Sequence, residues 1–219
     1  MRIVIVEDQS IIRELLRKVC TQELGFDVVA EAADGQQGVA AILRTAPDLV
    51  LLDLELPSVD GFTVIEMIRT SGMKPRILVF SSFYDEYSVY RIERAKVHGF
   101  MDKNFNNIRA VAAAIQAVGR GEAYFSAAFA KMKMARHADP QSFDKVLTDR
   151  EIVVLSLIGD LLSDTEIGEK LDMADRTAQK HRFNIMGKLA IGSRAELERY
   201  ARKHGFRQSV VRDQPPPGM

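Results

Sequence analysis

Three carboxylates near the start of the chain directly follow short apolar runs. Glu7 and Asp8 come after residues 3–6, and Asp53 comes after residues 49–52. Both runs are continuous and aliphatic, a pattern typical of strands that are buried in a parallel sheet. Because the carboxyl ends of parallel strands meet at one edge of the sheet, we expect these three carboxylates to lie close together.

A hydroxyl and an amine follow two later apolar runs. Ser81 comes after residues 77–80, and the run at residues 99–101 leads to Lys103. Carboxylates held close together repel each other unless a cation relieves them, and Mg²⁺ suits such a site because it keeps water ligands and leaves room for a phosphate. The ammonium group of Lys103 suits a phosphoryl oxygen. These residue types favour transfer of a phosphoryl group to a carboxylate, with Mg²⁺ as the cofactor.

A structural role is the alternative for each of these side chains. An Asp at the end of a strand is more often a helix cap or a turn residue than a reactive group. Five suitable side chains at the ends of four predicted strands are much harder to explain in that way. We therefore interpret the set as one phosphoryl-transfer site.

Strand and helix patterns alternate along the first 120 residues. The strand patterns lie at residues 3–6, 26–31, 49–52, 77–80 and 99–101, with helical patterns between them. This order predicts a doubly wound α/β fold of the flavodoxin type, in which helices cover both faces of a five-stranded parallel sheet. We place this domain at residues 1–121. Residues 122–145 are predicted to be a linker, because they carry no sustained apolar stripe.

From Leu147 onward the pattern is helical only. Thr148 and Glu151 have the spacing of a capping box and predict the start of a helix. A short helix at residues 163–171 and a basic helix at residues 176–189 are separated by a tight break, which predicts a helix-turn-helix. We expect a small all-α domain at residues 146–206, followed by a flexible tail at residues 207–219.

Charge is distributed unevenly, although the formal net charge is +0. Residues 176–212 carry ten Lys or Arg against Glu196 and Glu198, whereas residues 141–175 carry nine acidic residues against three basic ones. A basic segment behind an acidic one indicates a face directed at a polyanion. A solvated helix face is the alternative interpretation of the same charges.

Other residue types mainly exclude classes of protein. The single cysteine, Cys20, excludes an intrachain disulfide framework and a cysteine-based zinc site, and it fits a reducing cytoplasm. The four histidines lack metal-ligand spacing. No apolar run has the length of a signal peptide or a membrane span, so we expect a cytoplasmic protein that does not enter a membrane.

The N-terminal part resembles the receiver domains of two-component response regulators. The resemblance covers residues 1 to about 121, and the segments that carry it are Val6–Asp8, Leu52–Gly61, Phe80–Ser82 and Gly99–Lys103. It implies that Asp53 accepts a phosphoryl group from a sensor histidine kinase. It also implies a Mg²⁺ site formed by Glu7, Asp8, Asp53 and the backbone carbonyl of Glu55.

The same resemblance implies roles for three further side chains. Ser81 and Lys103 are expected to contact the phosphoryl oxygens. Ser81 and Phe100 occupy the positions of a hydroxyl and an aromatic side chain that reorient on activation. Pro57 and Gly61 look like residues that shape the loop after Asp53.

The C-terminal part is similar to the DNA-binding domain of the LuxR/NarL family, which includes FixJ-like response regulators. The matching segments are Leu147–Glu151, Glu166–Leu171, Arg176–Thr177, His181–Ile185 and Ser193–Leu197. The resemblance implies that residues 176–189 are the recognition helix and that the last helix, at about residues 193–204, is a dimer contact. The predicted DNA-binding residues are Arg176, Thr177, Gln179, Lys180, Arg182, Phe183, Asn184 and Lys188.

Within this set, Gln179, Lys180 and Phe183 are expected to face the DNA groove, while Arg182 contacts phosphate. Gln179 could read adenine and Lys180 could read guanine. The whole chain is thus predicted to be a transcription regulator that binds DNA as a homodimer when Asp53 is phosphorylated.

Two other functions use the same folds. In the first, the helical domain binds a protein rather than DNA, although the basic residues after position 176 argue against it. In the second, the acidic site is a phosphatase. The sequence shows no second base and no glycine-rich nucleotide loop, so we expect that the protein is not an enzyme.

Overall fold

The computed structural model describes residues 1–82, 85–104 and 107–207. These residues divide into two compact units, one formed by residues 1–82, 91–104 and 107–130 and the other by residues 85–90 and 131–207. Apart from Arg207, the predicted flexible tail lies outside the described residues. Among the described helices, none combines the length and the apolar character that crossing a membrane requires.

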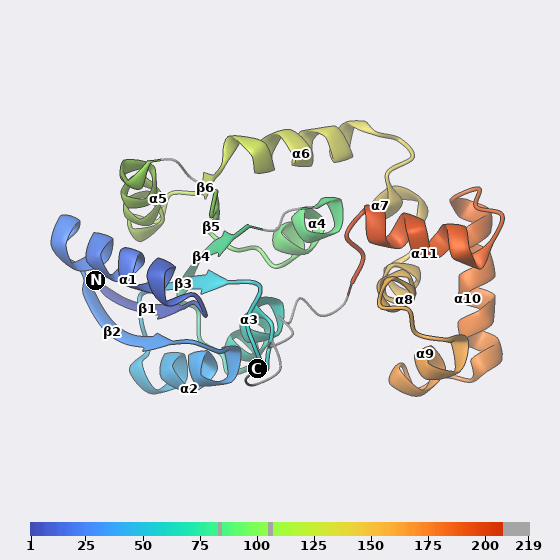
Figure 1. Cartoon of the computed structure of the whole chain (residues 1–219), viewed down its shortest axis with the longest axis horizontal. Helices are drawn as coiled ribbons and strands as arrows, with labels where there is room; N and C mark the ends of the chain where they lie inside the picture. Colours follow the sequence, from blue (N-terminus) through green and yellow to red (C-terminus); the bar gives the residue numbers. More distant parts are fainter. Residues whose placement is uncertain (83–84, 105–106, 208–219) are drawn as a thin grey trace, which may run out of the picture. The chain divides into compact units, whose positions relative to one another are not determined.

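The first unit is built on a parallel sheet (Figure 1). Its strands are β1 (Arg2–Val6), β2 (Asp27–Ala32), β3 (Leu49–Asp53), β4 (Arg76–Ser81), β5 (Gly99–Asp102) and β6 (Tyr124–Phe125). The strand order is β2-β1-β3-β4-β5-β6. The reversal of order beside β1 is the mark of the predicted doubly wound fold.

The predicted number of strands, five, is wrong, because the sheet has six. The additional strand, β6, pairs Tyr124 with Gly99 and Phe125 with Phe100. It lies in the segment that we assigned to the linker. A strand of two residues is too short to show any periodicity in a sequence, and it exists here because β5 offers its backbone edge.

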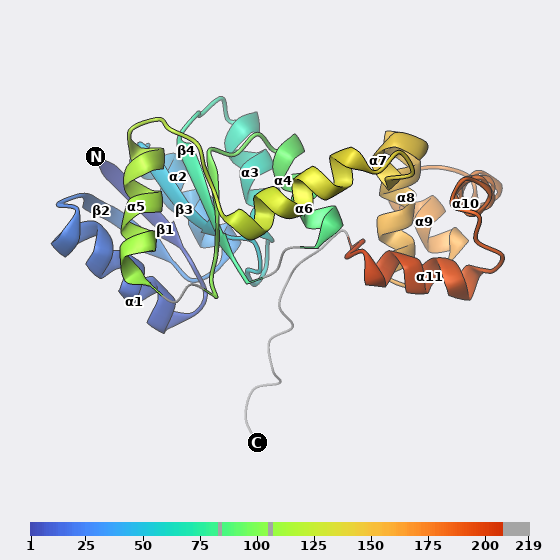
Figure 2. The same ribbon diagram turned by 90° about the horizontal axis from the view of Figure 1, so that it is seen from above.

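Helices cover both faces of the sheet. They are α1 (Ser10–Lys18), which continues into the π-helix η1 (Val19–Glu23), α2 (Gly35–Thr45), α3 (Gly61–Thr70) and α5 (Ile108–Gly119). Two more helices are α4 (Glu86–Arg94) and α6 (Ala127–Ala138). Figures 1 and 2 show α1 and α5 on one side of the sheet and α2 and α3 on the other.

Alternate residues of the strands supply the two faces, as the pleat of a strand requires. On the side of α1 and α5, Ile3, Ile5, Leu49 and Leu51 pack against side chains such as Val111 in one buried cluster. On the side of α2, Gly38 lies so close to the sheet that a Cβ atom there would be 2.6 Å from Cγ1 of Val6. Both faces are closed, and only the ends of the strands can carry polar chemistry.

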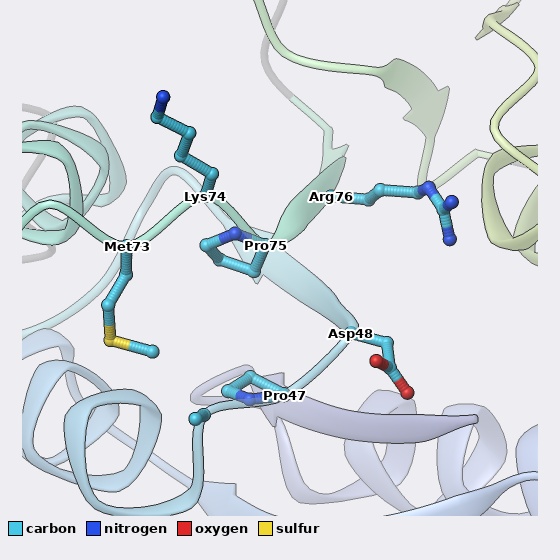
Figure 3. Close-up of a pocket in the computed structure, with 7 residues that line it drawn as sticks. Pro47, Asp48, Met73, Lys74, Pro75 and Arg76 are labelled. Carbon is cyan, nitrogen blue, oxygen red and sulfur yellow. The ribbon is translucent and has the colours of Figure 1, made fainter.

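At the edge where the strands begin, the loops before β3 and β4 line an open hollow of about 340 Å³ (Figure 3). Its charged side chains hold neighbouring chain segments together. Asp48 Oδ2 accepts a hydrogen bond from the backbone amide of Arg2 at 2.7 Å, and Arg76 Nη1 donates to the carbonyl of Gly119 at 2.8 Å. The predicted reactive groups all lie at the opposite edge.

The second unit is helical. It contains α7 (Phe143–Val146), α8 (Asp149–Gly159), α9 (Asp164–Lys170), α10 (Asp175–Lys188) and α11 (Arg194–Lys203). Both α8 and α9 begin with a complete capping box, formed by Thr148 with Glu151 and by Ser163 with Glu166. The helix-turn-helix predicted at residues 163–189 is α9 followed by α10. The core of the second unit contains apolar residues of four helices, including Leu155, Ile167, Ile185 and Leu197.

Candidate functional site

The sheet brings the predicted acidic residues to one edge. Strands β1 and β3 are neighbours in a register that pairs Val6 with Leu52. Glu7, which directly follows β1, and Asp53, the last residue of β3, are therefore the next residues along the two chain segments. Carboxylate oxygens of Glu7, Asp8 and Asp53 lie within 4.8 Å of one another. We call these three residues the acidic cluster.

Lys103 joins the acidic cluster from the loop after β5. Its Nζ lies 2.7 Å from Oδ2 of Asp53 and 2.8 Å from Oε1 of Glu7. Glu7 and Asp53 are each only 1% exposed and Lys103 is 9% exposed, so all three charges are withdrawn from water. Lys103 partly balances the two buried carboxylates, which would otherwise repel each other at short range.

The charge of the acidic cluster is not fully balanced by Lys103. Burial, and next the nearby charge of Asp53, raise the pKa of Glu7 from 4.5 to about 7, although Lys103 acts in the opposite direction. A surplus of negative charge among oxygen ligands is the condition in which a protein binds a hard divalent cation. The cluster therefore has the chemistry of a site for such a cation.

Asp53 is fixed by the loop that follows β3. The backbone amide of Glu55 donates to Asp53 Oδ1 at 3.1 Å, and the amide of Gly61 donates to the carbonyl of Leu54 at 3.0 Å. A Cβ atom on Gly61 would lie 2.3 Å from the backbone oxygen of Asp53. Only glycine lets α3 begin this close to Asp53, so the loop-shaping role predicted for Gly61 has a steric basis.

Ser81 and Phe100 are both completely buried. Ser81 ends β4, whose residue Phe80 pairs with Asp53, and Phe100 lies on the adjacent strand β5. The ring of Phe100 stacks on that of Phe129 in α6, with centroids 5.1 Å apart. The sequence prediction missed Phe129, which lies in the segment assigned to the linker. Phe125 and Phe129 have helix-like spacing there, and this was the only signal that could have identified it.

The predicted DNA-binding residues all lie on α10. Seven of the eight are exposed: Arg176, Thr177, Gln179, Lys180, Phe183, Asn184 and Lys188. The buried residues of this helix, Ala178 and Ile185, pack into the domain core. The polar and basic residues therefore form the outer face of the second helix of the helix-turn-helix.

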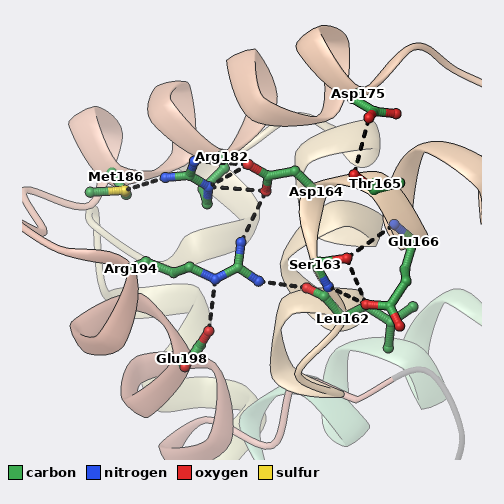
Figure 4. Close-up of polar contacts among 10 residues, drawn as sticks. All are labelled: Leu162, Ser163, Asp164, Thr165, Glu166, Asp175, Arg182, Met186, Arg194 and Glu198. Carbon is green, nitrogen blue, oxygen red and sulfur yellow. Dashed lines mark hydrogen bonds and ion pairs between the residues drawn. The ribbon is translucent and has the colours of Figure 1, made fainter.

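Arg182 differs from the other seven, because its guanidinium group is held inside the domain (Figure 4). Its Nε lies 3.0 Å from Oδ1 and its Nη2 lies 2.8 Å from Oδ2 of Asp164 in α9. Arg194 Nη1 reaches the same carboxylate at 3.1 Å. The hydrogen bond with Arg182 is the main reason why the pKa of Asp164 is lowered. No sequence pattern indicated that Asp164 pairs with Arg182 and Arg194, because these partners are 18 and 30 residues away along the chain.

Lys188 has one partner inside the domain. Its Nζ lies 2.7 Å from Oε2 of Glu151, the acidic residue of the first capping box. This contact joins α10 to the start of α8. Arg182 and Lys188 thus hold helices together, while the remaining six predicted residues lie on the exposed face.

Two known protein families match the chain. The response regulator receiver domain matches residues 3–116, which is more than half of the chain. The family described as bacterial regulatory proteins, luxR family, matches residues 145–201. The first match contains the acidic cluster, and the second contains α8, α9 and α10.

Whole proteins with this domain order are also similar. The transcriptional regulatory protein LiaR of Bacillus subtilis is 28% identical over 207 residues, covering 93% of this chain and 98% of LiaR. The fimbriae Z protein of Salmonella typhimurium is 30% identical over 204 residues, covering 92% of this chain and 96% of that protein.

Solved structures show the same fold. The response regulator ChrA of a heme-sensing two-component system is 25% identical, with a TM-score of 0.53 over 94% of this chain and 98% of ChrA. The response regulator RcsB in its DNA complex is 21% identical, with a TM-score of 0.62 over 92% of this chain and 98% of RcsB. At the latter identity the likeness supports the fold alone.

Proposed function

Since the chain belongs to the response regulators that join a receiver domain to a LuxR-type DNA-binding domain, we propose that phosphorylation of Asp53 controls its binding to promoter DNA. The receiver domain would comprise residues 1–121, residues 122–145 would connect the domains, and residues 146–206 would bind DNA. The partners are a sensor histidine kinase, duplex DNA and a second copy of this chain. The protein would meet them in the cytoplasm, where chromosomal DNA is found.

The proposed reaction transfers one phosphoryl group. A carboxylate oxygen of Asp53 attacks the phosphorus of a phosphohistidine on the kinase, an O–P bond forms, and the N–P bond to the imidazole breaks. Lys103 lies within 2.7 Å of Asp53 and can balance the charge on the phosphoryl oxygens. Ser81, which ends the neighbouring strand, supplies a hydroxyl that can bond to the same oxygens.

The acidic cluster would hold Mg²⁺. Glu7, Asp8 and Asp53 supply carboxylate ligands, and the backbone carbonyl of Glu55 completes the protein's share of the coordination shell. When bound, the ion would neutralise charge that develops on the transferred group. Glu7 must lose its proton to act as a ligand, which its pKa of about 7 allows close to neutral pH.

The exposed face of α10 would enter the major groove. The exposed side chains of this face include Arg176, Thr177, Gln179, Lys180 and Asn184. Together they supply positive charge for phosphates and hydrogen-bonding groups for base edges. Basic residues dominate affinity for DNA because they release the counterions that surround phosphates. The dimer would read two half-sites about one helical turn apart.

The observation that carries the proposal is the contact of Lys103 with both Glu7 and Asp53 at the ends of three strands. Treating the protein with an acyl phosphate donor and Mg²⁺ should add one phosphoryl group to the wild type and none to Asp53→Asn. Native mass spectrometry measures the modification and the oligomeric state. Duplex sequences selected from a random pool then report DNA affinity.

Phosphorylation is expected to increase dimer formation and DNA affinity of the wild type only. Equal affinity and equal oligomeric state of both proteins, with and without the donor, would exclude the switch. Binding that does not depend on salt, together with no affinity for any duplex, would favour a helical domain that binds a protein instead.

A further inference from the structure

Four residues of α10 form a stripe on the side of the helix that faces away from the core. Arg176, Lys180, Phe183 and Gly187 follow one another at intervals of four, three and four residues, which places them on one face of a helix. Ala178 and Ile185, on the opposite face, are buried. The centre of this stripe is an aromatic ring between two basic residues and a glycine.

Phe183 is a large apolar residue at the surface of the domain. It is 55% exposed, so it forgoes much of the free energy that burial gives an apolar side chain. The guanidinium carbon of Arg182 lies 4.6 Å from the centre of its ring. Arg182 donates hydrogen bonds from Nε and Nη2 to the carboxylate of Asp164, so the group that contacts the ring is itself fixed. The ring is thus braced on one side and open on the other.

Gly187 keeps the ring uncovered. A Cβ atom at this position would meet no atom within 4 Å, so neither packing nor close approach within the domain requires glycine there. Its backbone is not among those with positive φ, so left-handed geometry does not require glycine either. Side chains on a helix lean toward its N-terminus, and a side chain at 187 would therefore cover the turn that contains Phe183.

We propose that Phe183, braced by Arg182 and left uncovered by Gly187, determines sequence specificity by contacting the 5-methyl group of a thymine in the major groove. Arg176 and Lys180 make the same stripe positively charged, and this charge favours DNA, a polyanion, as the partner. Thymine is the base that presents a methyl group in the major groove, and an apolar side chain is the group that reads it. This inference rests on the proposed DNA binding and adds the chemical group that is recognised.

The test removes single methyl groups from DNA. Duplexes that the phosphorylated wild-type protein selects from a random pool are resynthesised with individual thymines replaced by deoxyuridine, which keeps base pairing and lacks only the methyl group. Loss of one buried methyl contact should weaken wild-type binding roughly fourfold at one thymine position in each half-site. Phe183→Ala should bind the thymine and uracil duplexes equally, and thermal melting checks that it remains folded.

Two further variants separate this contact from general effects on affinity. Gly187→Met places a flexible side chain over the ring and should also abolish the difference between thymine and uracil. Gln179→Ala lies on the same exposed helix face and should change affinity while keeping the thymine-to-uracil ratio of the wild type.

The possible outcomes distinguish failure of the proposed DNA binding from failure of the proposed methyl contact. If the wild type selects no duplex at all, the proposed DNA binding is wrong. If it selects duplexes but tolerates uracil at every thymine position, only the methyl contact is wrong. A thymine preference that survives in Phe183→Ala would assign the methyl group to another residue.

Discussion

Arg182 and Asp164 form a two-point ion pair that ties the two helices of the helix-turn-helix together. Nε and Nη2 of the arginine lie 3.0 and 2.8 Å from the two carboxylate oxygens. The side chains are 12% and 18% exposed, so water screens the pair only partly. A basic residue predicted to contact DNA phosphate thus fixes the helix that carries the other predicted contacts.

Replacing Asp164 with Asn should destabilise the DNA-binding domain by about 2 kcal/mol at neutral pH, because charged hydrogen bonds are lost around a partly buried arginine. The pKa of Asp164 is lowered below its ordinary 3.8, chiefly by the hydrogen bond with Arg182. The pair therefore stabilises the fold fully above about pH 4, and this stabilisation is lost as the pH falls further. Denaturant unfolding of wild type and Asp164→Asn measures it; a difference that stayed constant down to pH 2 would contradict the assignment.

Stability of the receiver domain without divalent cations should fall as the pH rises from 4.5 to about 7. Burial raises the pKa of Glu7 across this range, so the folded state binds a proton that the unfolded chain has already released. The loss should be on the order of 3 kcal/mol. Glu7→Gln should show a flatter pH profile in the same buffers with EDTA. Mg²⁺ should restore stability above pH 7 to the wild type more than to the variant.

Thr148→Ala should lower the free energy of unfolding of the DNA-binding domain by about 1 kcal/mol, because it removes a capping side chain. Thr148 Oγ1 accepts a hydrogen bond from the backbone amide of Glu151, and the carboxylate of Glu151 accepts one from the backbone amide of Thr148. Thr148→Ser keeps the oxygen and is the matched control. Equal midpoints for Ala and Ser in urea unfolding would show that the cap contributes nothing.

Lys180→Gln should weaken DNA binding and reduce the slope of log affinity against log salt by about 0.9, because one phosphate contact and its released counterion are lost. Lys18→Gln is a control of the same chemistry. Lys18 lies in α1 of the first unit, where its ammonium pairs with Glu14 at 2.8 Å. Fluorescence anisotropy over a range of salt concentrations gives both slopes. A slope unchanged in Lys180→Gln would place this residue away from phosphate.

Local patterns in the sequence were sufficient for strands β1 to β5, for the helix starts with capping boxes and for the edge of the sheet where the reactive groups lie. The apolar runs before Glu7 and Asp53 predict buried strands, and the Thr148–Glu151 spacing predicts a helix start that the structure confirms. These features depend on residues within one strand or one helical turn. The number of strands could not be found in this way, because Tyr124 and Phe125 form β6 only against the edge of β5.

Tertiary structure decided which charged groups bond directly. The sequence predicted that Lys103 shares a site with Glu7 and Asp53, whereas the fold showed its direct contacts with both, one of them 96 residues away. The sharing of Asp164 by Arg182 and Arg194, 18 and 30 residues away, was visible only in the fold. A charged side chain has several possible partners of opposite sign, and sequence spacing does not choose among them. The packed fold determines the partner, because a buried charge is stable only where the fold brings a group of opposite charge within hydrogen-bonding distance. The sequence by itself determined the residue types and the strand ends, and the packed fold determined the pairs.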